Sequence, residues 1–130
     1  MTVYRTTGLA ALVGIEPQEL EAEPVRARLA VTDDVLQPHG VVHGGTYGVL
    51  AESLTSAATD EAVRGEGNVA MGQSLTTTYL RPVTAGHLNA SGWARHRGRT
   101  TWVWDVEITD DDGRLCALAR ATVAVRPRPG

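Results

Sequence analysis

Phenylalanine and lysine are both missing from this sequence of 130 residues, so all twelve basic residues are arginines. The formal net charge is −3, which argues against general nucleic-acid binding, because such binding depends on a positively charged surface. Arginine forms bidentate contacts with phosphate, so an acidic protein can still carry a local phosphate site. The position of the arginines therefore matters more than their number.

Cysteine is almost absent, and no stretch approaches the roughly 20 apolar residues that cross a bilayer. The single cysteine, Cys116, cannot form an internal disulfide, and its apolar, alternating surroundings favour a buried, reduced thiol over a nucleophile. Met1 is not followed by a basic segment and an apolar run, as a signal peptide would require. We therefore expect a cytoplasmic protein with no membrane contact.

The length, the 42% content of apolar residues and the lack of repeats predict one globular domain over residues 1–130. Residues 1–24 form an N-terminal arm, in which Leu9, Leu12 and Val13 have the spacing of a short helix. Residues 25–126 form the core. The arm is expected to act as a lid or as a packing segment.

The pattern of apolar residues in the core predicts a strand, a long helix and then four more strands. Apolar residues recur at three- and four-residue steps between Gly44 and Arg64, as in a helix that faces a core. Alternating or apolar segments, which predict strands, run over Val25–Val31, Val69–Leu80, Leu88–Arg97, Thr101–Ile108 and Leu115–Val125. Short turns at Arg97–Arg99 and Asp110–Gly113 make the last strands antiparallel. The fold class is therefore α+β, an antiparallel sheet of about five strands wrapped around one long central helix.

The loop before the helix holds His39 and His43, which are four residues apart. On a helix this spacing is typical of a metal pair, but Pro38 and Gly40 place both histidines in a loop, and no third ligand is evident. We expect no metal site.

The residues around this loop and helix carry a resemblance. Gln37-Pro-His-Gly-Val-Val-His-Gly-Gly45, Leu50-Ala-Glu52, Ser56, Leu80-Arg-Pro82, His96-Arg-Gly98 and Asp112-Gly-Arg-Leu-Cys116 resemble the hotdog-fold acyl-CoA thioesterases. The resemblance extends from about residue 31 to residue 125. It is to the 4-hydroxybenzoyl-CoA thioesterase superfamily, and within it to the glutamate-using branch that hydrolyses aromatic acyl-CoAs such as 1,4-dihydroxy-2-naphthoyl-CoA. Phenylacetyl-CoA thioesterases tend to have aspartate where this chain has Glu52.

The resemblance implies a role for each residue of the catalytic site. Glu52 would be the nucleophile or general base, and the backbone N–H of Gly44 would be the oxyanion donor. Gln37 and His43 would orient the thioester or water, and Ser56 would contact the substrate or the attacking water. Simpler roles remain open, namely a tight turn at Gly44, a loop-packing amide at Gln37 and an inter-subunit contact at Glu52.

These residue types suit thioester hydrolysis. A helix N-terminus offers unpaired N–H groups and a partial positive charge where the carbonyl oxygen becomes negative. Glu52 is flanked by apolar residues, and we expect partial burial to raise its pKa and make it a better base. No metal or redox cofactor is needed, because coenzyme A is part of the substrate.

Four arginines near strand ends and a hairpin are candidates for the coenzyme A phosphates, namely Arg81, Arg95, Arg97 and Arg99. They could equally be solvated turn charges, and the sequence has no Gly-rich phosphate loop. Tyr47, Tyr79, Leu80 and the tryptophans could line the acyl pocket or belong to the core.

Alternation around Leu75–Tyr79 and Leu115–Val125 favours pairing with a second copy. The resemblance implies a homodimer or homotetramer with active sites between subunits. The expected activity is hydrolysis of an aromatic acyl-CoA. The alternatives are a broad-range thioesterase for fatty or polyketide acyl-CoA or acyl carrier protein, and a non-catalytic domain that binds acyl thioesters.

Overall fold

The computed structural model describes residues 6–130. Its α-helices are α1 (Gly8–Val13) and α2 (Gly44–Val63), and its short 3-10 helices are η1 (Asp33–Val35) and η2 (Arg64–Glu66). Its strands are β1 (Ile15–Glu19), β2 (Val25–Ala30), β3 (Asn68–Tyr79), β4 (His87–Arg97), β5 (Thr101–Thr109) and β6 (Leu115–Pro127). Each predicted strand and the long helix is present within a few residues of its expected bounds.

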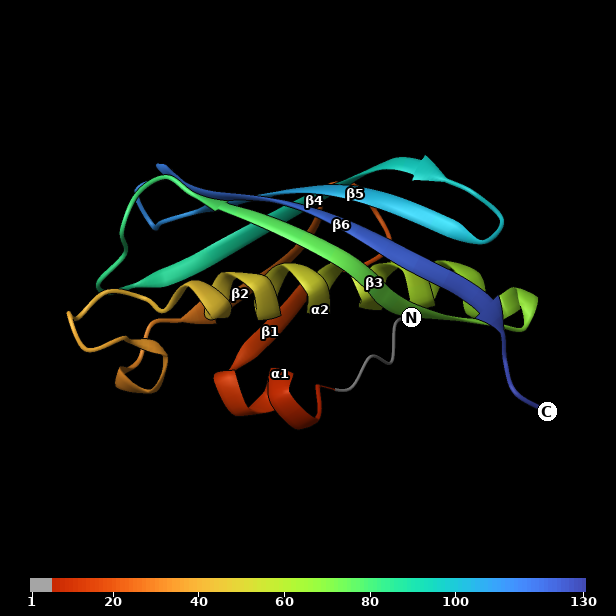
Figure 1. Ribbon diagram of the computed structural model, residues 1–130, viewed down its shortest axis with the longest axis horizontal. Coiled ribbons are helices and arrows are strands. Elements are labelled where there is room, and N and C mark those ends of the chain that lie inside the picture. Colours follow the sequence, from red (N-terminus) through yellow and green to blue (C-terminus); the bar gives the residue numbers. More distant parts are fainter. Residues whose placement is uncertain (1–5) are drawn as a thin grey trace.

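The six strands form one antiparallel sheet in the order β1-β2-β4-β5-β6-β3. Figure 1 shows this sheet arching over α2, which confirms the predicted hotdog arrangement. The sequence predicted about five strands, and the sixth, β1, lies in the segment assigned to the arm. β1 is a five-residue edge strand with Pro17 in its middle, and only Ile15 of its residues is buried. It therefore lacks the alternation that marks the other strands.

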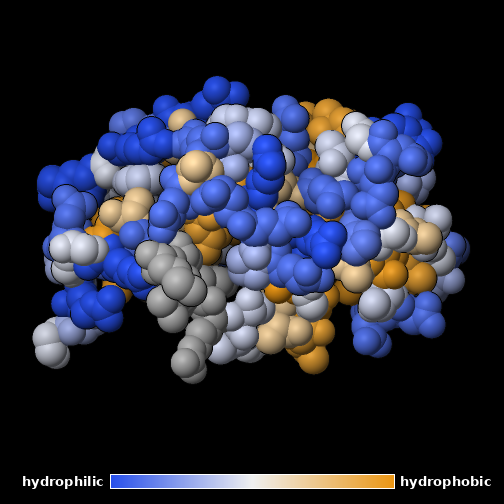
Figure 2. All heavy atoms as spheres, turned by 180° about the vertical axis from the view of Figure 1, so that it is seen from behind, coloured by the Kyte–Doolittle hydropathy of each residue, from blue (hydrophilic) through white to orange (hydrophobic). Residues whose placement is uncertain are grey.

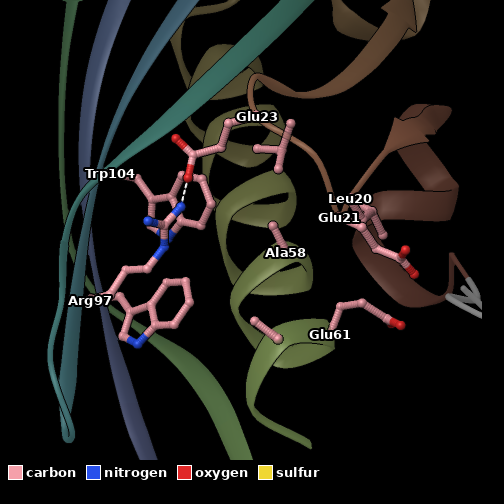
Figure 3. Close-up of a pocket in the computed structure, with 10 residues that line it drawn as sticks. Leu20, Glu21, Glu23, Ala58, Glu61, Arg97 and Trp104 are labelled. Atoms are coloured by element: carbon pink, nitrogen blue, oxygen red, sulfur yellow. Dashed lines mark ion pairs between the residues drawn. The ribbon is translucent and has the colours of Figure 1, made fainter.

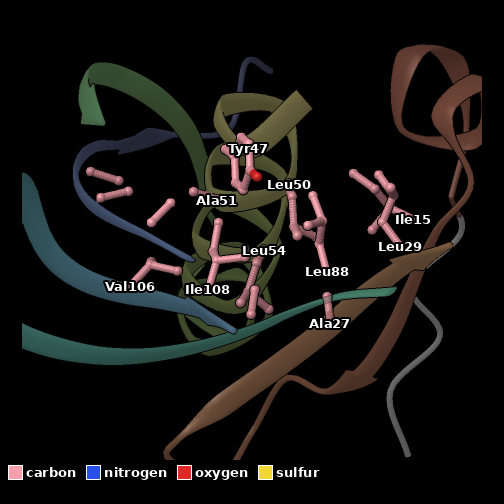
Figure 4. Packing of buried hydrophobic residues seen from close by; sticks show 14 of the residues in the cluster. Ile15, Ala27, Leu29, Tyr47, Leu50, Ala51, Leu54, Leu88, Val106 and Ile108 are labelled. Atoms are coloured by element: carbon pink, nitrogen blue, oxygen red, sulfur yellow. The ribbon is translucent and has the colours of Figure 1, made fainter. Parts of the chain in front are cut away.

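The core lies between α2 and the inner face of the sheet. Leu50 and Leu54 of α2 are almost fully buried, and Figure 4 shows them close to Leu88 and Ile108 of the sheet. Complete burial of one such side chain contributes about 1.5–3 kcal/mol. The small residue Ala51 is also fully buried, so the sheet can approach the helix closely.

Hydrogen bonds also connect the sheet to the helix. The indole Nε1 of the buried Trp104 on β5 donates to Thr59 Oγ1 on α2 at 2.8 Å, and Thr59 Oγ1 donates to Thr55 O at 2.7 Å. Each of these buried polar groups therefore has a partner, which makes its burial tolerable. Cys116 is a free thiol with no exposed surface, as the sequence predicted.

Charged residues connect three strands on the outer face of the sheet. Asp105 on β5 accepts hydrogen bonds from Arg95 on β4 at 2.7 Å and from Arg120 on β6 at 2.8 and 3.0 Å. The pKa of Asp105 is lowered, chiefly by the hydrogen bond from Arg120 and also by Arg95. This pairing draws the strands together across the sheet.

The edge strand β3 is the least covered part of the sheet. None of its twelve residues is buried, and the exposed fractions of Met71 and Tyr79 are 56% and 54%. Its one partner strand is β6, and the register of this pair shifts between Gly72 and Ser74, which marks a β-bulge. The edge of β3 is therefore open to pairing with another strand.

The face seen from behind is mostly hydrophilic, with separate apolar patches (Figure 2). No helix within residues 6–130 has both the length and the apolar character to cross a bilayer.

Candidate active site

The N-terminus of α2 presents a free backbone N–H group. The Gly45 N–H donates to His43 Nδ1 at 3.0 Å, and the Thr46 N–H donates to His43 O at 2.9 Å. Among the described residues the N–H of Gly44 has no such partner. A helix N-terminus leaves its first N–H groups without intrahelical acceptors, and here two of them are capped while that of Gly44 stays available for an anion.

His43 is the N-cap of the helix. Because Nδ1 accepts the Gly45 N–H, the neutral ring carries its proton on Nε2. The imidazole is exposed, so the Nε2–H can donate to a molecule bound near the helix N-terminus. The structure thus gives His43 a structural role, and the orienting role that the resemblance implies stays a prediction.

Gln37 lies in the preceding loop, where its Oε1 accepts the backbone N–H of His39. Its backbone closes the same turn, since Gln37 O accepts the Gly40 N–H at 2.9 Å. Its amide nitrogen has no hydrogen-bond acceptor among residues 6–130. The loop-packing role of Gln37 is therefore present, and its amide nitrogen stays free to bind a ligand.

In the described part of the chain, no group of three or more His, Cys, Asp or Glu residues is arranged to hold a metal ion.

Glu52 lies in the middle of α2 and contacts β3. Its carboxylate rests directly on the backbone of Gly72, since a Cβ atom added there would come within 3.0 Å of Glu52 Cδ and closer still to Oε2. The side chain is exposed in the single chain, so the expected partial burial is absent from it. The reason is the open β3 edge beside it, which no other element of the described chain covers.

Ser56 follows Glu52 by one helical turn, on the same face. Its Oγ is inaccessible and has no hydrogen-bond partner among the described residues. A buried hydroxyl without a partner costs about 1–3 kcal/mol, and in the single chain this Oγ is enclosed and out of reach of a substrate.

A groove of about 370 Å³ opens beside the helix N-terminus. It is lined by Gly44, by the rings of Tyr47 and Tyr79, and by Leu80 and Arg81. The two tyrosine rings pack at a tilt of 51°, with 5.5 Å between their centroids. An apolar group attached to a carbonyl near the Gly44 N–H would fit against these rings.

The four candidate arginines do not form one cluster. Arg81 lines the groove beside Gly44. Arg97 and Arg99 lie at and just beyond the C-terminal end of β4, at the other end of the sheet. The two ends are about 30 Å apart, since an eleven-residue strand has about that length. Arg95 pairs with Asp105 on the outer face. Arg97 pairs with Glu23 and lies over the ring of Trp102, as Figure 3 shows for the ion pair.

Gly72 was not predicted from the sequence as a residue of the site. A glycine inside a strand often marks a bulge or a close approach, so a signal was present. The sequence could not show which side chain approaches it.

The tryptophans Trp102 and Trp104 lie at the other end of α2 from the groove, in a hollow with Ala58 and Glu61.

Comparisons with known proteins identify the family of the chain. A family profile described as "Thioesterase superfamily" matches residues 39–117. The chain is 33% identical to a 1,4-dihydroxy-2-naphthoyl-CoA hydrolase of Listeria monocytogenes, over 93% of this chain and 98% of that protein. It is 34% identical to the proofreading thioesterase EntH of Klebsiella pneumoniae, over 90% of this chain and 85% of that protein.

A similar solved structure is that of a mutant of thioesterase PA1618 from Pseudomonas aeruginosa. It superposes with a TM-score of 0.86 at 37% identity, covering 90% of this chain and 84% of that one. The sheet, the helix and these matches define a hotdog-fold thioester hydrolase. The chain belongs to the thioesterase superfamily.

Proposed function

We propose that the protein hydrolyses an aromatic acyl-CoA to the free acid and coenzyme A. The free N–H of Gly44 at the start of α2 carries the proposal, because thioester hydrolysis needs a donor for the carbonyl oxygen as it becomes negative. The tyrosine-lined groove beside it favours a flat ring over a long alkyl chain. The hydrolase of Listeria named for a naphthoyl-CoA substrate is consistent with this choice.

In the proposed reaction the thioester carbonyl oxygen accepts the Gly44 N–H. Glu52 either removes a proton from the attacking water or adds its own oxygen to the carbonyl carbon, forming an anhydride that water then cleaves. In both versions the C–S bond breaks, and the departing thiolate takes up a proton. His43 Nε2 and the Gln37 amide orient the thioester or water. Ser56 contacts one of them in the assembled site, which requires that its Oγ, enclosed in the single chain, becomes accessible there. No metal or redox cofactor takes part in this scheme.

One chain is insufficient for this site. Glu52 follows Gly44 by eight residues, which places them about 12 Å apart along the helix axis, too far to act on the same carbonyl. We therefore propose that Gly44 of one subunit acts with Glu52 of a second copy. The open edge of β3, beside Glu52, supports a homodimer paired along this strand, and a homotetramer would join two such dimers.

For coenzyme A, Arg81 is the favoured phosphate contact, since it lies beside the groove. Arg95 and Arg97 already form ion pairs within the chain, and Arg99 lies in the β4–β5 hairpin. The cytoplasm stays the proposed location. A fatty or polyketide acyl group, on coenzyme A or on acyl carrier protein, is the second candidate substrate, because the groove is open and mostly apolar.

The test measures thiol release from benzoyl-, hydroxybenzoyl-, phenylacetyl-, dihydroxynaphthoyl-, short-chain and long-chain acyl-CoAs. We expect the highest kcat/KM with an aryl-CoA and a loss of at least about a thousandfold in Glu52→Ala. Glu61→Ala, a change on the same helix near its other end, serves as the control. A higher kcat/KM with long-chain acyl-CoAs than with aryl-CoAs would favour a fatty or polyketide acyl group as the substrate. Unchanged turnover in Glu52→Ala would show that Glu52 takes no part in the mechanism.

A further inference from the structure

The groove beside Gly44 contains a hydroxyl group without a partner. Tyr47 on α2 is only 3% exposed, and no residue of the described chain forms a hydrogen bond with its hydroxyl. The other tyrosine of the groove, Tyr79, accepts the hydroxyl proton of Thr77 at 3.0 Å, and its own hydroxyl proton has no acceptor among the described residues. Within residues 6–130, Ser56 Oγ is the one enclosed side-chain atom without a partner, so the Tyr47 hydroxyl keeps some accessible surface, and Tyr47 is a lining residue of the groove.

The Tyr47 hydroxyl has no acceptor within the described chain, so its proton is available to a molecule bound in the groove. Burial raises the pKa of Tyr47 to about 12, and the neighbouring Cys116 and Tyr79 add to the shift. The phenol therefore stays protonated and can donate a hydrogen bond across the physiological range of pH.

The helix fixes the spacing between Tyr47 and Gly44. Tyr47 follows Gly44 by three residues, so the two are neighbours on one helix face, about 5–6 Å apart at their Cβ positions. The contact with the Tyr79 ring, 5.5 Å between centroids, holds the Tyr47 ring in place. A ligand whose carbonyl lies at the Gly44 N–H would bring its next polar group close to Tyr47.

We propose that Tyr47 determines specificity, its hydroxyl donating a hydrogen bond to an acceptor oxygen of the bound thioester about one helical turn from the reacting carbonyl. The inference rests on the proposed function. Two parts of the substrate can supply this oxygen. One is a hydroxyl or carbonyl group on the acyl portion, and the other is the amide carbonyl of the pantetheine arm nearest the sulfur.

The test compares wild type with Tyr47→Phe on three benzoyl thioesters and one further substrate. The benzoyl thioesters are those of coenzyme A, N-acetylcysteamine and butanethiol, and the further substrate is hydroxybenzoyl-CoA. Phenylalanine keeps the ring and removes only the donor. We expect kcat/KM to fall about tenfold or more wherever the substrate carries the acceptor, with no change where it does not.

The pattern of losses identifies the source of the acceptor. A loss confined to hydroxybenzoyl-CoA assigns the acyl portion. A loss shared by the coenzyme A and N-acetylcysteamine thioesters, but absent from the butanethiol thioester, assigns the pantetheine amide. Equal losses with every substrate, or no loss at all, overturn the inference, because a purely structural role does not distinguish between substrates.

Tyr79→Phe is the matched comparison, since it removes the other hydroxyl of the groove. It should not reproduce the substrate-dependent pattern of Tyr47→Phe, and a pattern equal to that of Tyr47→Phe would contradict the assignment to Tyr47. Thermal unfolding of both variants checks that the fold is retained. If wild type releases no thiol from any substrate, the proposed function itself fails. If wild type is active and Tyr47→Phe has the same kcat/KM as wild type with every substrate, only this inference fails.

Discussion

Gly72 gives Glu52 the space in which its carboxylate lies. The strand residue has no side chain, and the glutamate from α2 occupies the position that a Cβ atom would take. The adjacent β-bulge changes the direction of the following residues. Gly72 therefore fixes the position of the proposed catalytic group without touching a substrate itself.

We expect Gly72→Ala to lower kcat by about a hundredfold while changing the thermal stability little. The added methyl group displaces the Glu52 carboxylate. Because the carboxylate is the mobile end of an exposed side chain, its displacement costs the fold little, but it moves the proposed catalytic group away from its reacting position. Steady-state kinetics and a thermal melt of the same preparation measure the two effects. Gly65→Ala is the control, since a Cβ atom there meets nothing within 4 Å. Full activity in Gly72→Ala would show that the carboxylate position is not critical.

The long helix and the four long strands could be predicted because their periodicity is strong. The apolar positions of α2 repeat over twenty residues, and β5 alternates along its whole length. β1 could not be predicted, because five residues that include a proline carry too little pattern. Its pairing with β2, and not its own sequence, makes it a strand.

The candidate site could be predicted only where it follows the chain locally. Gly44 stands at the start of a predicted helix, so its free N–H follows from that start, whereas the capping role of His43 was not predicted. The contact of Glu52 with Gly72 and the hydrogen bond of Gln37 to the His39 backbone depend on tertiary geometry. The exposure of Glu52 also differs from the sequence prediction, because burial was inferred from its neighbours along the helix and not from the sheet edge beside it.

The ion pairs that join β4, β5 and β6 on the outer face of the sheet should make the stability of the protein depend on pH. The folded-state pKa of Asp105 is lowered, chiefly by Arg120, so its contribution exists above the unfolded pKa and disappears as the pH falls through the lower folded value. We expect Asp105→Asn to lower the free energy of unfolding by about 1 kcal/mol at pH 7. The difference from wild type should shrink steadily below about pH 4, near the ordinary aspartate value.

Urea unfolding of wild type and Asp105→Asn at pH 7, 5 and 3 measures this difference. Asp112→Asn is a suitable control, because the Asp112 side chain is 78% exposed and has one ion-pair contact, with Arg114 at 3.3 Å. A penalty for Asp105→Asn that is the same at all three pH values would mean that packing, and not charge, connects the strands.

The proposed two-chain site predicts complementation between inactive subunits. Gln37→Ala and Glu52→Ala damage opposite halves of the site, so a mixed dimer contains one site with both defects and one site with none. Random pairing of equal amounts makes half of the dimers mixed, so about a quarter of wild-type activity should return. Thiol release is measured after the two variants are unfolded together and refolded.

The control refolds each variant alone, and it should stay inactive. If a single chain held the complete site, every chain in the mixture would have one defect, and mixing would restore nothing.

The uncovered edge of β3 has a final consequence for how fast the enzyme works at different abundances. A catalyst divided between two chains exists only while the chains are associated. Below the dissociation constant of the dimer, its rate should therefore rise with the square of the protein concentration instead of in proportion to it. A modest change in expression of such a protein would then produce a larger change in flux, and a strongly diluted sample would lose specific activity without any subunit unfolding.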